Sequence, residues 1–414
     1  MNKTRMGQFA ALDVGSTKVC CLIANASSNG PIRVIGVGHH AAKGVRGGAI
    51  IDMDAAQNAI LTAVSAAEQL ADVQIRDVVV NVSGANLTSQ TYGLEFPISG
   101  REINDSDMRR ALAQCNGIQQ NSDREILHCL PVEYSIDSTK GIRDPRGMFA
   151  EKLGVDIHIV TARTATLRNL ANCINRCHLE IEIAIAAPYA SGLACLAEDE
   201  IDLGVTLVDM GGGTTTIAVF YDGEVIHTDS IPVGGQHVTS DIARGLSTSL
   251  THAERMKTLY GTALGSPSDE GELIDVPLVG EENNHQPNHV PRSILNGIIR
   301  PRIEETMELV RSRLNDAGMN RRAGRRLVVT GGASQLQGTR ELATLILEKQ
   351  VRMGRPRRIS GLAEANSGPA FSTSTGLLRY AVEKQTDTRD QLETIPAGMD
   401  KHISRFSQWL KESF

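Results

Sequence analysis

LDVGSTK at residues 12–18 and LVDMGGGTTT at residues 207–216 follow the same plan. In each stretch an apolar run reaches an aspartate, a glycine follows one residue later, and hydroxyl-bearing residues lead into a second apolar run. This pattern predicts a strand, a tight glycine turn and a second strand. Asp13 and Asp209 occupy equivalent places in the two copies, so we expect an internal repeat and two similar α/β domains.

Both predicted turns have the composition of a phosphate-binding turn. Backbone N–H groups of Gly, Ser and Thr form a concave nest for phosphate oxygens, and glycine is needed where a phosphate comes close to the backbone. Two such turns would hold one polyphosphate from both sides, whereas one alone would suit a plain hairpin equally well. We expect Asp13 and Asp209 to hold waters around a magnesium ion, and Lys18 to reach a phosphate as a point charge.

Two further segments are candidates for the rest of such a ligand site. In LVVTGGASQLQG (327–338), Gly331 and Gly332 allow a close backbone approach, although an ordinary strand-to-helix turn explains the pattern as well. In THAERMKTLYG, Glu254 and Lys257 are one helical turn apart. Thr251 and Glu254 also match a capping box, which would explain Glu254 without a ligand.

Composition and charge narrow the class of protein. With 414 residues, 41% hydrophobic and 22% charged, the chain has the composition of a soluble globular protein of several compact units. A formal net charge of −6 gives no general attraction to nucleic acid, so we expect no nucleic-acid partner. Two arginine clusters are interpreted as solvated surface, with anionic lipid as the alternative. They are Arg321, Arg322, Arg325 and Arg326, and Arg352, Arg355, Arg357 and Arg358.

Cysteine usage points to a reducing compartment. The seven cysteines are an odd number scattered along the chain, and the first residues lack a signal-peptide apolar core. Cys173, Cys177 and His178 resemble metal spacing, but they accompany an apolar helical stripe, which favours buried structural thiols. No apolar run reaches the ~18 to 20 residues of a spanning helix, so we expect a chain that does not cross a bilayer.

The predicted secondary structure changes along the region between the two repeats. A helix at 56–71 and a strand at 77–84 are predicted first, and residues 85–166 then read as a small inserted α+β unit. The polar stretch 265–291 is expected to be loop or weak strand. Residues 384–400 are expected to be a flexible linker before the tail.

The C-terminal tail, residues 401–414, holds the only tryptophan of the chain. Its apolar and charged residues separate onto two sides of a helix too short to span a bilayer. The apolar side is Ile403, Phe406, Trp409, Leu410 and Phe414, and the cations are Lys401, Arg405 and Lys411. The pattern favours a helix lying on anionic membrane lipid. The alternative is a helix docked on its own domain or on a neighbouring subunit.

LDVGSTK, LVDMGGGTTT, AERMK and VVTGGAS, in this order, resemble the actin, Hsp70 and sugar-kinase ATPase superfamily. Within it, KGVRGGAIIDMDAAQNAI, PVGGQHVTSDIA and the amphipathic tail resemble the family of the bacterial cell-division protein FtsA. The resemblance covers nearly the whole chain. It implies an actin-like two-domain ATPase fold with duplicated phosphate-binding hairpins, an FtsA-type inserted α+β subdomain and a C-terminal amphipathic helix.

The resemblance also implies the domain boundaries. The first core would comprise 1–84 and 167–197, with return of the chain near 366–383, and the inserted subdomain 85–166. The second core would comprise 198–233 and 325–365, and its small subdomain 234–324. The linker (384–400) and a membrane-targeting helix (401–414) would follow.

Carried over residue by residue, the resemblance implies that ATP and Mg²⁺ are the ligands. The residues implied on the first side are Asp13, Gly15, Ser16, Thr17 and Lys18, and those on the second side are Asp209, Gly211, Gly212, Gly213 and Thr214. Glu254 and Lys257 would contact the nucleoside, with Gly331, Gly332 and Ala333 across from them. Relatives such as MreB and Hsp70 carry an acidic residue where Ala187 precedes Pro188 here, so we expect weak or absent ATP hydrolysis.

The function implied is that of an actin-like division adaptor. It would self-assemble into filaments on the cytoplasmic face of the bacterial inner membrane and tether the tubulin-like FtsZ ring through the FtsZ C-terminal peptide. Other division proteins would bind the inserted subdomain. The alternatives are a PilM-like pilus-assembly protein, or a kinase or ATPase enzyme on the same fold.

Overall fold

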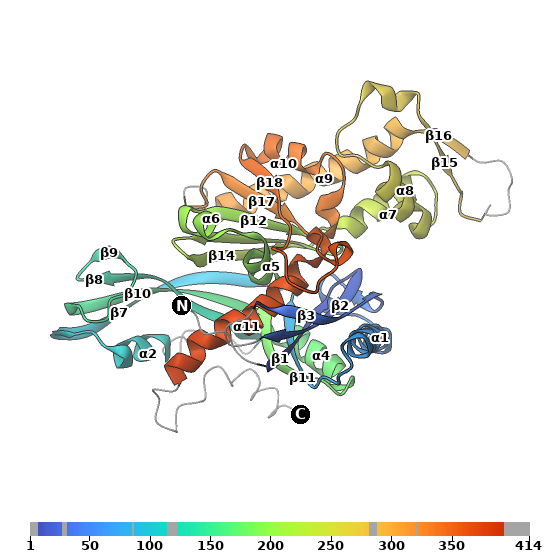
Figure 1. The fold of residues 1–414 in the computed structure, drawn as a ribbon. Coiled ribbons are helices and arrows are strands. Elements are labelled where there is room, and N and C mark those ends of the chain that lie inside the picture. Colours follow the sequence, from blue (N-terminus) through green and yellow to red (C-terminus); the bar gives the residue numbers. More distant parts are fainter. Residues whose placement is uncertain are drawn as a thin grey trace.

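The structure is a computed structural model of the 414-residue chain. It describes residues 7–26, 31–84, 87–113, 123–280, 288–319 and 322–392, with side chains up to residue 382. Two sheet-based domains lie one above the other in Figure 1. The inserted subdomain extends to one side and a mostly helical subdomain to the other.

The sheet of the first domain has the strand order β11-β6-β1-β2-β3. Its strands are β1 (Gly7–Val14), β2 (Lys18–Ala26), β3 (Arg33–Ala41), β6 (Asp77–Val82) and β11 (Glu180–Ala186). Helices α1 (Met53–Ala71) and α4 (Thr164–Asn175) complete this domain, together with the short strands β4 (Val45–Arg46) and β5 (Ala49–Ile50). The core of the domain is formed by interior strands such as β2, which buries Val19 to Ala24 without interruption.

The sheet of the second domain repeats this topology, in the order β18-β17-β12-β13-β14. Its strands are β12 (Val205–Met210), β13 (Thr215–Tyr221), β14 (Glu224–Ile231), β17 (Arg326–Thr330) and β18 (Gln350–Met353). In both sheets an antiparallel hairpin is followed by a third antiparallel strand and flanked by a parallel strand. The registers also agree, since Asp13 lies opposite Cys20 and Asp209 lies opposite Thr216. The predicted internal repeat and its two hairpins are confirmed.

The inserted subdomain is a four-stranded antiparallel sheet with one described helix. Its elements are β7 (Thr88–Glu102), α2 (Asp105–Ala113), β8 (Arg124–Ile136), β9 (Thr139–Ile142) and β10 (Phe149–Arg163), and the strand order is β7-β10-β8-β9. It has its own apolar cluster, which includes Phe96, Leu153 and Ile157. An independent core explains how such a unit can be inserted into the first domain while both sheets keep their topology.

The small subdomain of the second domain contains α7 (Gly235–Gly245), α8 (Leu250–Tyr260) and α9 (Arg292–Asp316). The polar stretch 265–291 forms a 3₁₀ turn, Pro267–Glu270, and a two-stranded ribbon of β15 (Leu273–Val276) and β16 (Asn288–Pro291), in agreement with the expectation of loop or weak strand. Residues 281–287 lie outside the described part of the chain. The remaining elements of the second domain are α6 (Glu198–Leu203), α10 (Thr339–Leu347) and the 3₁₀ turns Gly332–Gln335 and Glu364–Asn366.

Helices α5 (Ala187–Cys195) and α11 (Ser372–Leu392) pack together between the two sheets, and a 3₁₀ turn at Pro369–Phe371 leads into α11 (Figure 1). Helix α11 corrects the predicted linker, because residues 384–392 continue the helix. No glycine or proline interrupts the sequence between Gly376 and Pro396, so nothing local stops the helix where the linker was expected. The rest of the linker and the tail lie outside the described residues.

Two further expectations concern the described residues: buried structural thiols at Cys173 and Cys177, and the absence of a membrane-spanning helix. Cys173 and Cys177 are free and buried in the first domain, as expected for structural thiols. Among the described helices, none is long and apolar enough to cross a membrane.

Candidate functional site between the two hairpin turns

The two glycine turns close with the same backbone hydrogen bond. The N–H of Gly15 donates to the carbonyl of Lys18 at 3.0 Å, and the N–H of Gly211 donates to the carbonyl of Thr214 at 2.9 Å. Each turn follows the carboxyl end of a central strand, β1 or β12. The repeat therefore extends from the sheets to the conformation of the turns.

The two turns approach each other directly. A Cβ atom on Gly212 would overlap the Thr17 side chain, and one on Gly213 would overlap the Ser16 side chain. The Gln236 amide, from the start of α7, donates to the carbonyl of Ser16 at 3.3 Å. Glycine is thus required where the turn of one domain meets the turn of the other.

Asp13 and Asp209 are buried beside these turns, 8% and 7% exposed. Burial raises the pKa of Asp13 to about 7; Lys18 opposes this shift and the Asp209 charge adds to it. Burial also raises the pKa of Asp209, opposed by hydrogen bonds from Ser191 and Thr373. Two buried carboxylates that repel one another form a favourable environment for a hydrated divalent cation, which would compensate both charges.

Lys18 lies at the same place. Its ammonium group donates to the carbonyl of Ala370 at 2.6 Å and lies 3.2 Å from the centre of the Phe371 ring. Burial lowers the pKa of Lys18, while the neighbouring Asp13 and Asp209 oppose this shift. A partly desolvated cation beside the turn is suited to an anionic ligand.

The nucleoside candidates gather on the side of the second domain. Lys257 donates to Glu254 at 2.6 Å, to the Thr239 hydroxyl at 2.9 Å and to the carbonyl of Gly235 at 3.2 Å. A Cβ atom on Gly235 would lie 3.0 Å from the Cβ atom of Ala333. Glu254, Lys257 and Ala333 therefore come together around the start of α7, although they are far apart in sequence.

The alternative explanation of Glu254 as part of a capping box is wrong. Helix α8 begins at Leu250 with Ser249 as its N-cap, and the Ser249 hydroxyl accepts a hydrogen bond from the N–H of His252 at 3.2 Å. Thr251 lies inside the helix, so Thr251 and Glu254 are not at the cap and third positions. The carboxylate of Glu254 instead bonds Lys257 and Thr239.

Gly331 has a backbone conformation that favours glycine, with φ 89°. A Cβ atom there would overlap the Asp209 carboxylate and the carbonyl of Met210. A Cβ atom on the next residue, Gly332, would lie 3.7 Å from the Cβ atom of Ala370. The absence of side chains at these two glycines lets the turn after β17 lie next to Asp209 and next to Ala370.

Five residues of this site were not predicted from the sequence. They are Ser191, Gln236, Ala370, Phe371 and Thr373. Each is separated from its partner by many residues, 352 in the case of Lys18 and Ala370, and no local spacing reveals such a contact. The one available signal is the run Ser372 to Thr375, four hydroxyl residues in succession.

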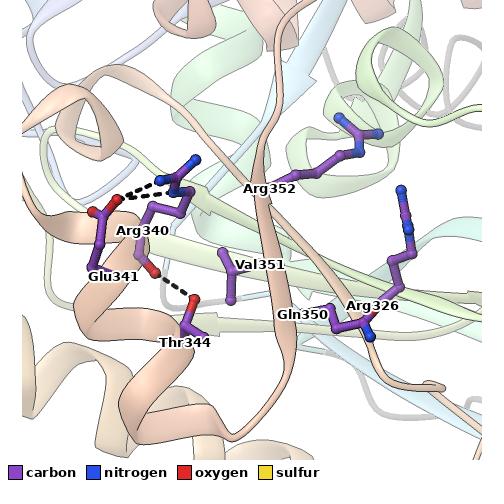
Figure 2. Close-up of a pocket in the computed structure, with 7 residues that line it drawn as sticks. All are labelled: Arg326, Arg340, Glu341, Thr344, Gln350, Val351 and Arg352. Atoms are coloured by element: carbon purple, nitrogen blue, oxygen red, sulfur yellow. Dashed lines mark hydrogen bonds and ion pairs between the residues drawn. The ribbon is translucent and has the colours of Figure 1, made fainter.

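A separate pocket lies away from the turns, along strand β18 and helix α10 (Figure 2). Its volume is about 490 Å³. The residues around it are Arg326, Arg340, Glu341, Thr344, Gln350, Val351 and Arg352, and none belongs to the turns. The pocket includes one arginine from each of the two arginine clusters, Arg326 and Arg352, so the contacts of these two side chains can be examined.

The arginines of this pocket are paired with carboxylates. Arg352 and Arg326 donate to Glu200 at 2.7 and 3.2 Å, and Arg340 donates to Glu341 at 3.0 Å. The hydrogen bonds from Arg352 are the main cause that lowers the pKa of Glu200 to about 2. Two of the cluster arginines, Arg326 and Arg352, are thus paired with a carboxylate, as expected for ordinary surface arginines. Arg321 lies outside the described residues.

Comparison with known proteins agrees with this architecture. A family model described as Cell division protein FtsA matches residues 206–376, and a model described as SHS2 domain inserted in FTSA matches residues 84–161. Two solved structures share the fold at low sequence identity. The PilM-PilN type IV pilus biogenesis complex has a TM-score of 0.64 at 16% identity, covering 91% of this chain and 99% of that one. MreB5 of Spiroplasma citri bound to ADP has a TM-score of 0.55 at 14% identity, covering 94% and 99%.

Relatives of much higher identity extend over the whole length. Cell division protein FtsA of Rhizobium meliloti is 45% identical over 417 residues, which cover 98% of this chain and 94% of that protein. Cell division protein FtsA of Escherichia coli strain K12 is 33% identical over 411 residues, which cover 97% of each. The chain therefore belongs to the cell division protein FtsA family and has an actin-like fold with the inserted subdomain of that family.

Proposed function

We propose that the chain binds ATP with Mg²⁺ between its two hairpin turns. The observation that carries this proposal is the pair of facing turns, one from each domain, with a buried carboxylate beside each. Ser16, Thr17 and Lys18 would bind the phosphates from one side, and Gly211 to Thr214 from the other. When bound, the hydrated cation would neutralise Asp13, Asp209 and the phosphate charge together.

The nucleoside would have Glu254 and Lys257 on one side. The turn formed by Gly331, Gly332 and Ala333 would lie on its other side. The support is the proximity of Lys257 and Ala333 to Gly235. The fold neighbour MreB5 has been solved with ADP and with AMPPNP, which is in keeping with a nucleotide site on this fold. Polar groups of the nucleoside would donate hydrogen bonds to Glu254, whose side chain is 54% exposed and therefore accessible.

We propose that hydrolysis is slow. Ala187 is the first residue of α5 and lies one helical turn before Ser191, which contacts Asp209. A methyl group at this position cannot orient an attacking water. The nucleotide would then act mainly as a structural ligand that stabilises the arrangement of the two domains.

The membrane role rests on the tail and on the family. The five apolar side chains of residues 403–414 would contribute about 7 to 15 kcal/mol on burial, and ordering the segment costs a comparable amount, so one tail would bind weakly. Many tails on one filament would bind strongly through effective concentration. The chain would thus be a peripheral protein that assembles on the cytoplasmic face of the inner membrane at the division site and tethers FtsZ there.

Emission of Trp409, the single tryptophan, tests this proposal. Anionic vesicles are titrated into the full chain with and without ATP and Mg²⁺, and a blue shift that strengthens with nucleotide is expected. Phe406→Glu and neutral vesicles serve as controls that should both weaken the shift. An emission that is already blue-shifted in buffer and indifferent to vesicles would mean a tail docked on protein, against the adaptor proposal.

A kinase or vigorous ATPase is the competing function. Good kinases turn over ~1 to 100 times per second, so phosphate release above about 1 per second would favour an enzyme. The pilus-assembly alternative has only a shared fold in its favour, since the PilM complex is 16% identical, whereas family relatives are 33 to 45% identical over the full length.

A further inference from the structure

Two hydroxyl groups hold the carboxylate of Asp209. The Ser191 hydroxyl donates to Oδ2 of Asp209 at 2.5 Å, and the Thr373 hydroxyl donates to the same oxygen at 3.2 Å. The two hydroxyls are also 3.0 Å from each other. The three groups form a closed triangle around one carboxylate oxygen.

These hydroxyls reach Asp209 from other parts of the fold. Ser191 belongs to α5, which directly follows the last strand of the first-domain sheet, and Thr373 belongs to α11. Asp209 is the second-last residue of β12, a strand of the second-domain sheet. The contact therefore connects the second sheet to the two helices that lie between the domains.

The other oxygen of Asp209 is constrained as well. Gly331 approaches Oδ1 so closely that a Cβ atom there would overlap it. Two hydroxyls therefore hold the carboxylate at Oδ2, and next to Oδ1 there is no room for a side chain at position 331. A carboxylate held in this way keeps one orientation toward a cation.

The repeat shows why Asp209 needs this support. In the first turn, Lys18 is close enough to Asp13 to oppose the rise of its pKa. The residue at the equivalent position of the second turn is Thr214, which carries no charge. Lys18 opposes the rise in the pKa of Asp209 as well, but the hydrogen bonds from Ser191 and Thr373 oppose it more strongly. The two aspartates are thus equivalent in the backbone but different in their stabilising partners.

We propose that Ser191 and Thr373 are positioning residues that orient the Asp209 carboxylate toward the hydrated divalent cation of the nucleotide. Because both come from the helices between the domains, they make the magnesium-supported part of nucleotide affinity depend on the packing of these helices. This inference rests on the proposed function. It adds to it the residues that link the cation to the interdomain helices.

Thr373→Val and Thr373→Ser form the matched pair for the test. Valine keeps the shape and removes the hydroxyl, whereas serine keeps the hydroxyl. Ser191→Ala is an independent variant, and Thr375→Val is the control. Thr375 is on the same helix and is fully buried, whereas Thr373 is partly buried, and the Thr375 hydroxyl has no hydrogen-bond partner among the described residues. Circular dichroism melting of each variant establishes that it folds.

The affinity of the full chain for a fluorescent ATP analogue is measured in excess Mg²⁺ and in EDTA. A hydrogen bond to a charged group suggests that Thr373→Val and Ser191→Ala each weaken binding about tenfold in Mg²⁺, with little change in EDTA. Thr373→Ser and Thr375→Val should bind as wild type does. This difference between the two conditions would not arise from a purely structural role.

Two results would overturn the inference. Unchanged affinity in Thr373→Val and Ser191→Ala, or a loss that is equal in Mg²⁺ and in EDTA, would show that the hydroxyls do not act through the cation, while the proposed nucleotide site would stand. A wild-type chain that binds the analogue without any effect of Mg²⁺, or not at all, would instead refute the proposed site and with it this inference.

Discussion

Asp13→Asn tests the electrostatics of the site. Asp13 is 8% exposed, and its pKa is raised from 3.8 to about 7, chiefly by burial. A carboxyl group that holds its proton more tightly in the folded state than in the unfolded state makes the free energy of unfolding fall as pH rises between the two pKa values. The ligand-free protein should therefore lose stability from this group between about pH 4 and pH 7.

The size of this effect follows from the same two values. An interval of about 3 pH units corresponds to about 4 kcal/mol at 1.36 kcal/mol per unit, fully developed above pH 7. Asparagine has nearly the same shape and does not ionise, so the variant should escape this loss. An unfolding entropy of about 2.1 cal/mol/K per residue gives about 1 °C per kcal/mol for a chain of 414 residues, so the Tm of the variant at pH 8 should exceed that of the wild type by about 5 °C.

The assay is thermal unfolding of the full chain from pH 4 to pH 8 without ligand, expressed as variant minus wild type so that other titrating groups cancel. Asp77→Asn, at the exposed start of β6, is the control and should give a flat difference. The difference for Asp13→Asn should be near zero at pH 4 and grow toward pH 8. A flat difference, or a variant less stable than wild type at pH 8, would refute the reasoning.

Three other substitutions test separate parts of the structure. Gly213→Ala should weaken ATP-analogue binding at least tenfold in a fluorescence titration, because the new methyl group overlaps Ser16 of the opposite turn; Gly265→Ala, with open space around it, should not. Lys257→Met should weaken binding to a similar extent in Mg²⁺ and in EDTA, because the proposed site places Lys257 on the nucleoside side; an effect confined to Mg²⁺ would contradict this placement. Glu200→Gln should cost roughly 2 to 3 kcal/mol in urea unfolding at pH 7, because the folded pKa of Glu200 is lowered to about 2. The wild-type advantage should fade as pH falls from about 4.5 toward 2, and a pH-independent difference would count against the ion pair as its origin.

The sequence predicted those features that are encoded locally. Each hairpin lies within one window of about twenty residues, where the alternation of apolar run, glycine and hydroxyl residues depends only on neighbours in the chain. The same holds for the inserted α+β unit predicted at residues 85–166. The predicted capping box at Thr251 was wrong for a local reason as well, because Ser249 two residues earlier offers an equally good cap and α8 begins there.

The partners of the charged groups could not be predicted in this way. Lys18 meets Ala370, and Asp209 meets Ser191 and Thr373, through contacts that exist only after both sheets and the two helices between them have packed. A serine in a run of small residues is expected to be buried, and its hydroxyl could bond the helix backbone just as well. Only the three-dimensional arrangement shows that this hydroxyl faces Asp209.

Several of these contacts are made by one short segment of the chain. The short segment 369–373 supplies the carbonyl that binds Lys18, the aromatic ring beside it and one of the hydroxyls on Asp209. It therefore contacts the charged groups of both domains at once. The same segment begins α11, whose backbone is helical up to Leu392, where the part of the chain leading to the tail begins. A ligand bound at Lys18 and Asp209 would therefore act on side chains that contact the start of this helix. A single helix, α11, thus spans most of the sequence between Thr373 and the tail that begins at Lys401.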